Sequence, residues 1–237
     1  MARVPPPPVP PQPGTPDSLR AQLLATEHWS LLASRSTAQS EVLIRISILL
    51  TLVSAGLVSL ALVGQVTDFS DAFPLYAIAI LSVITLIGFL TQVRVNNVGM
   101  EDLMYVLAMN RLRAAYLELD PGIRPYLMAG SNDDLAGMSR TYFFLDPMRN
   151  RHQLAGSTMI FVVVVNSALV GLLGAAILTA LGVRMPVPGI AAVVLGFLYC
   201  ALSLVRGGLE FTRFWRTYEP LFPTPSEKPQ PPRGSGP

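Results

Sequence analysis

Four long apolar stretches without a charged residue constrain this chain more than any other feature of its sequence. The first two, residues 46–67 and 72–93, hold 22 residues each, and the third, residues 153–183, holds 31. The fourth runs over residues 189–205. Because an α-helix rises about 1.5 Å per residue, about 20 apolar residues cross a hydrocarbon core of about 30 Å. The sequence therefore predicts four transmembrane helices.

The composition agrees with a chain that lives in a lipid bilayer. Hydrophobic residues make up 51% of the 237 residues and charged residues only 14%, whereas soluble domains carry about 25% charged residues. The formal net charge of +2 is too small to indicate binding to nucleic acid. We therefore expect the bilayer as the main partner and no nucleic acid.

Short links between the apolar stretches predict how the four helices are paired. Residues 67–74 join the first two, and Pro74 suits the first turn of the second helix. Residues 184–189, with two prolines and a glycine, join the last two. The predicted fold is an all-α integral membrane protein in which two transmembrane helical hairpins are joined by a cytosolic helical segment.

The segments outside the spans differ sharply in composition. Residues 1–16 and 223–237 are rich in proline, and we expect both to be disordered tails. Between these tails, the sequence predicts five further segments. They are a cytosolic juxtamembrane helix (17–40), a first transmembrane hairpin (41–93), a cytosolic helical segment (94–153), a second transmembrane hairpin (154–206) and an interfacial segment of aromatic and basic residues (207–222).

The basic residues predict the orientation in the membrane. Sixteen of the 17 lie in the N-terminal segment, the middle segment or the C-terminal tail, and only Arg184 lies in a link on the other side. Loops that hold many Lys and Arg residues stay in the cytoplasm. Both termini and the middle segment are therefore predicted to be cytoplasmic, as an even number of spans requires.

Small residues recur every four positions on three of the spans. In a bilayer, such faces let helix backbones approach closely, and polar side chains among them form hydrogen bonds between helices. The candidate packing residues are Ser47, Thr51, Ala55, Ser59, Asn166, Gly171 and Gly196. The pattern leaves open whether the contacts lie within one chain or between chains. For Asn166, both an interhelical hydrogen bond and a place in a pore lining remain open.

The middle segment predicts a helix over residues 99–119 that is apolar on two opposite faces. Leu103 and Leu107 lie on one face, and Tyr116 lies on the other. A lone helix cannot bury both faces. Three candidates could bury these faces: the rest of the middle segment, the helix over residues 19–32, or a second copy of the chain. The sequence does not decide between them. The candidate interaction residues are Leu103, Leu107, Arg111, Arg113 and Tyr116.

The side chains that catalysis or metal binding would need are sparse. The chain has one cysteine, Cys200, and two histidines, His28 and His152. Neither histidine has an acid or a nucleophile at a spacing that indicates a catalytic site. Residues 132–134, Asn-Asp-Asp, lack the alternating ligands of a calcium loop, so we expect a helix N-cap or a solvated turn. No catalytic residue, metal site or cofactor is predicted, and an enzyme is not expected.

Two runs of the sequence resemble a family of uncharacterised bacterial multi-pass membrane proteins. The runs are residues 26–33, TEHWSLLA, and 109–121, MNRLRAAYLELDP, followed by Pro125-Tyr126 and Asp133-Asp134. The likeness covers about residues 19 to 180, and that family has no assigned activity. It implies residence in the bacterial plasma (inner) membrane. A weaker, architectural likeness to membrane effectors of bacterial conflict systems rests on analogy alone.

Three function classes follow from these observations. The favoured one is a membrane-anchored helical platform that binds a second copy of itself or a cytosolic protein partner. The alternative is an oligomeric channel or pore-forming protein, including a conflict-system-like effector, lined by hydroxylated residues such as Ser47, Thr51 and Ser59. An enzyme ranks last.

Overall fold

The computed structural model describes residues 16–70, 72–143 and 157–225, and these parts contain helices and no strand. The helices are α1 (Asp17–Val66), α2 (Phe73–Leu119), the short 3-10 helix η1 (Pro121–Tyr126), α3 (Leu135–Tyr142), α5 (Thr158–Ala180) and α6 (Val187–Thr217). Four of them, α1, α2, α5 and α6, are long and apolar enough to cross a membrane. The predicted all-helical class with four such helices is confirmed.

Helices α1 and α2 are much longer than a bilayer requires. They hold 50 and 47 residues, which corresponds to about 75 and 70 Å. The polar run of residues 34–40 holds neither Gly nor Pro, so α1 passes through it unbroken, as the sequence predicts. Helix α2 continues beyond its apolar half to Leu119, where Pro121 follows and the Asp120 carboxylate accepts from the Gly122 amide at 2.8 Å.

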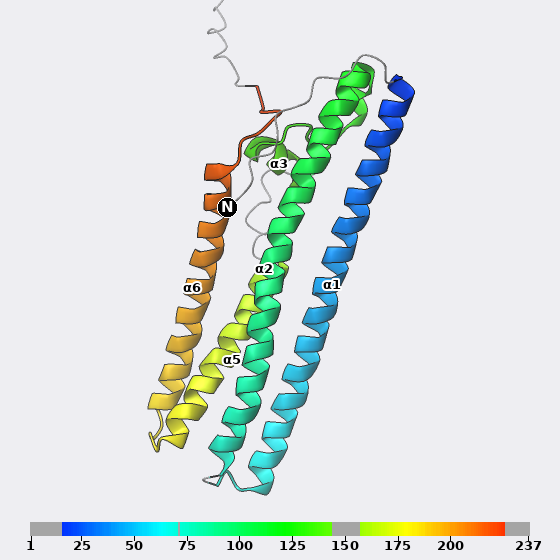
Figure 1. Ribbon diagram of the computed structural model, residues 1–237. Helices are drawn as coiled ribbons and strands as arrows, with labels where there is room; N and C mark the ends of the chain where they lie inside the picture. Colours follow the sequence, from blue (N-terminus) through cyan, green and yellow to red (C-terminus); the bar gives the residue numbers. More distant parts are fainter. Residues whose placement is uncertain (1–15, 71, 144–156, 226–237) are drawn as a thin grey trace, which may run out of the picture.

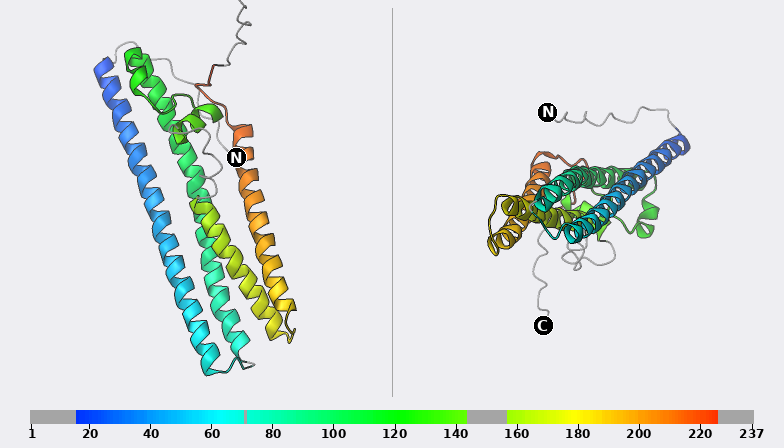
Figure 2. Two further views of the ribbon diagram at one scale, coloured as in Figure 1. Left: turned by 180° about the vertical axis from the view of Figure 1, so that it is seen from behind. Right: turned by 90° about the horizontal axis from the view of Figure 1, so that it is seen from below.

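The long helices lie side by side, with α1 antiparallel to α2 and α5 antiparallel to α6 (Figure 1). Helix α5 also packs on α2, which places α2 in the centre of the assembly (Figure 2). Two apolar clusters fill the seams. One joins Val42 and Ile46 of α1 to Val95 of α2 and Val162 of α5, and the other is centred on Leu49, Leu81, Ile84 and Leu169.

One end of the assembly holds everything that extends beyond the apolar halves of the helices. We call this end the head, and it comprises residues 17–40, 94–143 and 207–225. Helix α3 lies there beside the distal half of α2, and the C-terminal end of α6 returns to the same place (Figure 1). Three segments far apart in the sequence therefore meet around the distal half of α2.

Candidate functional site

An apolar cluster forms the core of the head. It is centred on Leu103, Val106, Leu107 and Met109 of α2 and on Met138 of α3. Leu103 and Leu107 are only 4% and 2% exposed. These two predicted interaction residues therefore stabilise the head from inside and do not lie on its surface.

The cover of this cluster comes from three directions. Leu31 of α1 and Tyr142 of α3 pack on it, as two of the predicted alternatives allow. The third contribution, from Phe214 and Trp215 of α6 and from Tyr218 directly after it, was not predicted. The three ring centroids lie 5.1 to 5.7 Å apart, with Phe214 stacked on Tyr218 and Trp215 edge-on to both, and the rings pack on the cluster of α2 and α3. That residues 207–222 lie at the lipid interface stays a prediction.

A fully buried carboxylate, that of Asp133, ties α2 to the C-terminal end of the chain. It accepts hydrogen bonds from Arg111 Nε at 2.6 Å and from the Tyr218 hydroxyl at 3.0 Å. The backbone amides of Leu221 and Phe222 donate to it at 3.0 and 2.7 Å. Burial alone would raise the pKa of Asp133, but the two amides, Arg111 and Tyr218 outweigh it, so the pKa lies below its usual value.

Residues 218–224, which we call the C-terminal strap, are fastened by the neighbours of Asp133 as well. The Thr224 amide and hydroxyl donate to the Asp134 carboxylate at 2.6 and 2.9 Å. Asp134 also caps α3, since its Oδ1 accepts from the Gly137 amide at 2.8 Å. The predicted N-cap is confirmed, whereas the idea of a solvated turn is wrong for Asp133, whose side chain is fully buried.

A second polar centre, Asn110, fixes the loop that precedes α3. Its amide donates to the Asn132 carbonyl at 2.8 Å, and its Oδ1 accepts from Arg113 Nη1 at 2.7 Å and from the Thr141 hydroxyl at 2.8 Å. Asn110 is fully buried, so each of these bonds compensates a group that has lost its water. The contact of Arg113 with Asn110 gives this predicted interaction residue a supporting place inside the head.

Ion pairs join α1 to the distal half of α2. Arg35 contacts Asp102 with two nitrogens, at 2.6 and 3.1 Å, and the Tyr142 hydroxyl of α3 donates to the same carboxylate at 2.5 Å. Further out, the Tyr116 hydroxyl donates to the Leu24 carbonyl at 3.0 Å. Of the five predicted interaction residues, Arg111, Arg113 and Tyr116 therefore all make contacts within the chain.

The strongest polar group of the spans, Asn166, lies where α5 meets α2. Its amide donates to the Gly88 carbonyl and to Gln92 Oε1, both at 2.8 Å, so the structure shows an interhelical hydrogen bond. A Cβ on Gly88 would lie 2.2 Å from Asn166 Oδ1, which explains why α2 has a glycine there. Gln92 also accepts from the Tyr199 hydroxyl at 2.9 Å and donates to Ser203 Oγ at 3.1 Å, both on α6.

The small residues of α5 and α6 face each other. A Cβ on Gly171 would lie 2.4 Å from the Ala192 carbonyl oxygen, and one on Gly196 would lie 2.9 Å from the Ser167 carbonyl oxygen. Close approach of the two backbones therefore depends on the absence of a side chain at these positions.

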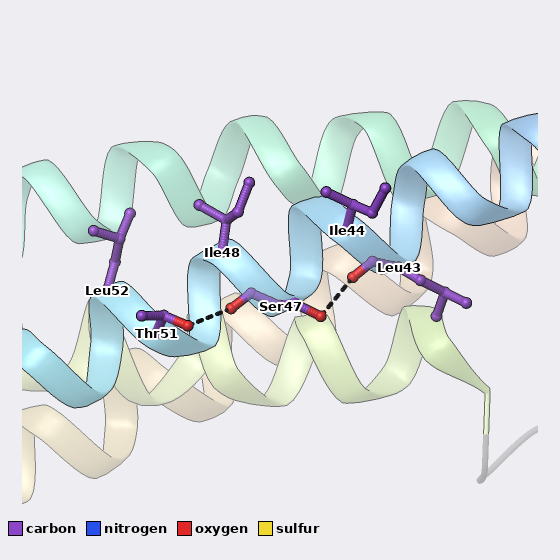
Figure 3. Close-up of a pocket in the computed structure, with 6 residues that line it drawn as sticks. All are labelled: Leu43, Ile44, Ser47, Ile48, Thr51 and Leu52. Carbon is purple, nitrogen blue, oxygen red and sulfur yellow. Dashed lines mark hydrogen bonds between the residues drawn. The ribbon is translucent and has the colours of Figure 1, made fainter.

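The small residues of α1 behave differently, because three of the four face away from α2. Ser47, Thr51 and Ala55 are exposed, and only Ser59 is half-buried, where its hydroxyl lies 2.8 Å from that of Tyr76. Two shallow hollows of about 420 and 730 Å³ follow this outer face. Figure 3 shows the residues that line the first of them. The hydroxyls of Ser47 and Thr51 donate to carbonyls one turn back, both at 2.9 Å.

The outer face of α1 continues into the head. Leu19, Leu23 and Trp29 are 46%, 61% and 71% exposed. At 100° per residue, Trp29 shares the helix side of Ser47 and Thr51. We call Trp29, Ser47, Thr51, Ala55 and the exposed residues between them on that side the outer α1 face.

The described residues hold no group of three or more His, Cys, Asp or Glu side chains that could bind a metal ion. His28 stacks on Tyr116 with ring centroids 6.0 Å apart. Burial, aided by the charge of Arg113, lowers the pKa of His28. The contacts that the structure describes in the head therefore hold helices together.

Comparison with known proteins finds no matching family model, no matching curated protein and no matching solved structure.

Proposed function

We propose that this chain is a multi-pass protein of the bacterial plasma membrane, with both termini cytoplasmic, that works as an oligomerisation platform. Helices α1 and α2 pair as one transmembrane hairpin, and α5 and α6 pair as the other. The head stands in the cytoplasm, where 16 of the 17 basic residues of the chain are expected. The partner that the platform binds is a second copy of the same chain.

The observation that carries this proposal is the unpartnered outer face of α1. Helix α1 packs along α2 with Val42, Ile46 and Leu49, and among the described residues its opposite side contributes to none of the apolar clusters. Ser47, Thr51 and Ala55 line the two shallow hollows on this side. In lipid, small and hydroxylated residues favour helix association because backbones approach closely.

The head extends the same interface beyond the bilayer. Exposed Leu23 and Trp29 would be buried between two copies of α1, and large aromatic side chains dominate the energy of such contacts. The rigid ties of the head, namely Arg35 with Asp102 and Arg111 with Asp133, hold α1 and α2 in one arrangement. A preorganised surface loses less entropy on association.

Mass photometry of the full-length protein in lipid nanodiscs tests the proposal. We expect the wild-type chain to form a discrete oligomer, and Thr51→Phe to weaken association about tenfold, since interhelical contacts in lipid contribute about 1–2 kcal/mol. Val194→Phe is the matched control, because Val194 is a 56% exposed residue of α6, outside the outer α1 face. A wild-type chain that stays monomeric at every protein density would contradict the proposal.

A channel is the second candidate, and it is favoured by the exposure of hydroxyls on the outer α1 face. The donors of Ser47 and Thr51 are used within α1, which leaves oxygen lone pairs for water or ions. A ring of copies that turned these residues inward would line a pore. Purified oligomers in liposomes should then pass ions, and oligomers that leave bilayers silent across voltages would eliminate this function.

A further inference from the structure

A cleft of about 320 Å³ lies between α2 and α6, where the apolar halves of the helices meet the head. Both helices run toward the head (Figure 1), so residue number increases toward the head on each wall. The end nearer the head holds Asn97, Arg206 and Glu210, and the other end holds Phe89, Gln92 and Tyr199. The cleft is therefore charged toward the head, and its other end is uncharged, with apolar Phe89, Val93 and Leu202 beside polar Gln92 and Tyr199.

The walls of the cleft are held by side chains that bridge α2 and α6. Gln92 donates to Ser203 Oγ at 3.1 Å and accepts from Tyr199 at 2.9 Å. Nearer the head, Asn96 donates to the Glu210 carboxylate. Together with the apolar packing of Phe214 and Trp215 on α2 in the head, these bridges set the separation of the two helices, so the cleft exists before a ligand arrives.

Two opposite charges stand at the polar end. Arg206 Nε lies 3.4 Å from Glu210 Oε1, and their side chains are 82% and 39% exposed. The remaining N–H groups of a guanidinium suit a phosphate, and a carboxylate suits an ammonium group. The pair carries no net charge, which matches a head group that is itself neutral overall.

We propose that this cleft binds one phospholipid whose head group carries a phosphate and a primary ammonium group. The phosphate lies at Arg206, the ammonium at Glu210, and an acyl chain follows Phe89 and Leu202, which are 49% and 61% exposed. A primary ammonium donates hydrogen bonds to Glu210, whereas a trimethylammonium has no N–H to donate. The inference requires that the chain spans a bilayer and is independent of oligomer formation.

Native mass spectrometry of the full-length protein, titrated with single lipids, tests this inference. We expect one phosphatidylethanolamine per chain, bound about fivefold more tightly than phosphatidylcholine or phosphatidylglycerol, because an exposed charge pair contributes up to about this factor. Glu210→Gln should abolish the preference and keep the bond from Asn96. Arg213→Gln, which changes an exposed arginine of the same helix outside the cleft, should leave the preference unchanged.

A second variant separates loss of the cleft from loss of folding. Val93→Trp fills the cleft from an exposed wall position and touches neither charge, so it should remove the bound lipid, while Val194→Trp should not. Equal binding of the three lipids, or lipid retained by Val93→Trp, would overturn the inference. Displacement of the lipid by an equal concentration of glycerophosphoethanolamine would overturn it too, because the ligand would then be a soluble metabolite.

Discussion

Asp133, in the loop before α3, connects two other segments of the head, α2 and the C-terminal strap, through its carboxylate. It accepts from Arg111 of α2 and, in the C-terminal strap, from the Tyr218 hydroxyl and from the amides of Leu221 and Phe222. A buried charge is stable in a protein only when it is paired and fully hydrogen-bonded. At the residue scale, Asp133 therefore determines whether the strap stays on the head.

Replacing Asp133 by asparagine should destabilise the head by about 2 kcal/mol, because hydrogen bonds to a charged group contribute about 1.5–3 kcal/mol and Arg111 loses its partner. Thermal unfolding, followed by the fluorescence of Trp215 in a Trp29→Phe background, measures this. The control is Glu118→Gln, which removes an exposed ion pair with Arg20 and should change the free energy of unfolding by less than about 0.5 kcal/mol. Equal effects of the two variants would refute the role of Asp133.

The pKa of Asp133 also predicts how the head responds to acid. Because its pKa is below the ordinary value in the folded protein, the unfolded chain takes up the proton first as the pH falls. The contribution of Asp133 is thus complete above about pH 4 and is lost as the pH falls through the folded pKa. Asp102 and Asp134 have lowered pKa values for similar reasons. Stability should fall below about pH 4, with a shallower slope in Asp133→Asn, and parallel slopes would count against this assignment.

At the scale of elements, close approach and polar bridges determine how the helices pair. Gly171 lets α5 lie against the Ala192 carbonyl of α6, and Asn166 bonds α5 to α2. Helices α2 and α6 are bridged by Gln92 and Asn96. Each pair of helices is therefore held by its own contacts: close backbone approach between α5 and α6, and hydrogen-bonded side chains between α5 and α2 and between α2 and α6. A substitution in one of these contacts should leave the others intact.

The variant Gly171→Val should force α5 and α6 apart, because its Cβ would meet the Ala192 carbonyl at 2.4 Å. We expect a loss of about 1–3 kcal/mol in unfolding from mixed micelles, as overpacking usually costs. Ala180→Val adds similar bulk at an exposed position of the same helix and should have little effect. If Gly171→Val is as stable as the wild-type chain, the α5–α6 contact described above is wrong.

The sequence predicted the four apolar helices and the unbroken passage of α1 through residues 34–40, because these depend on local composition. It could not predict that Phe214 and Trp215 pack on the apolar cluster that holds Leu103 and Leu107, because the α2 and α6 parts of this packing lie about a hundred positions apart in the sequence. It also could not separate the small face of α1, which stays exposed, from that of α5, which packs on α6. The four-residue spacing of small residues marks a face that can pack closely, but it does not identify the helix that packs there.

At the scale of the whole molecule, the distribution of arginine predicts the topology. A single cysteine at an exposed position of η1, Arg124→Cys in a Cys200→Ser background, should resist an impermeant maleimide in intact cells and react after permeabilisation. Arg184→Cys, in the exposed link before α6, should react in intact cells. The reverse pattern would place the head outside the cytoplasm and refute the proposed orientation.

Assembly through the outer α1 face is the central claim, and cysteine cross-linking in native membranes tests it most directly. In the Cys200→Ser background, Thr51→Cys on the outer α1 face and Val194→Cys on the exposed side of α6 should insert equally well. Oxidation should join two chains through position 51 and leave chains with the cysteine at position 194 unlinked. Cross-linking at 194 but not at 51, or at neither position, would contradict the account.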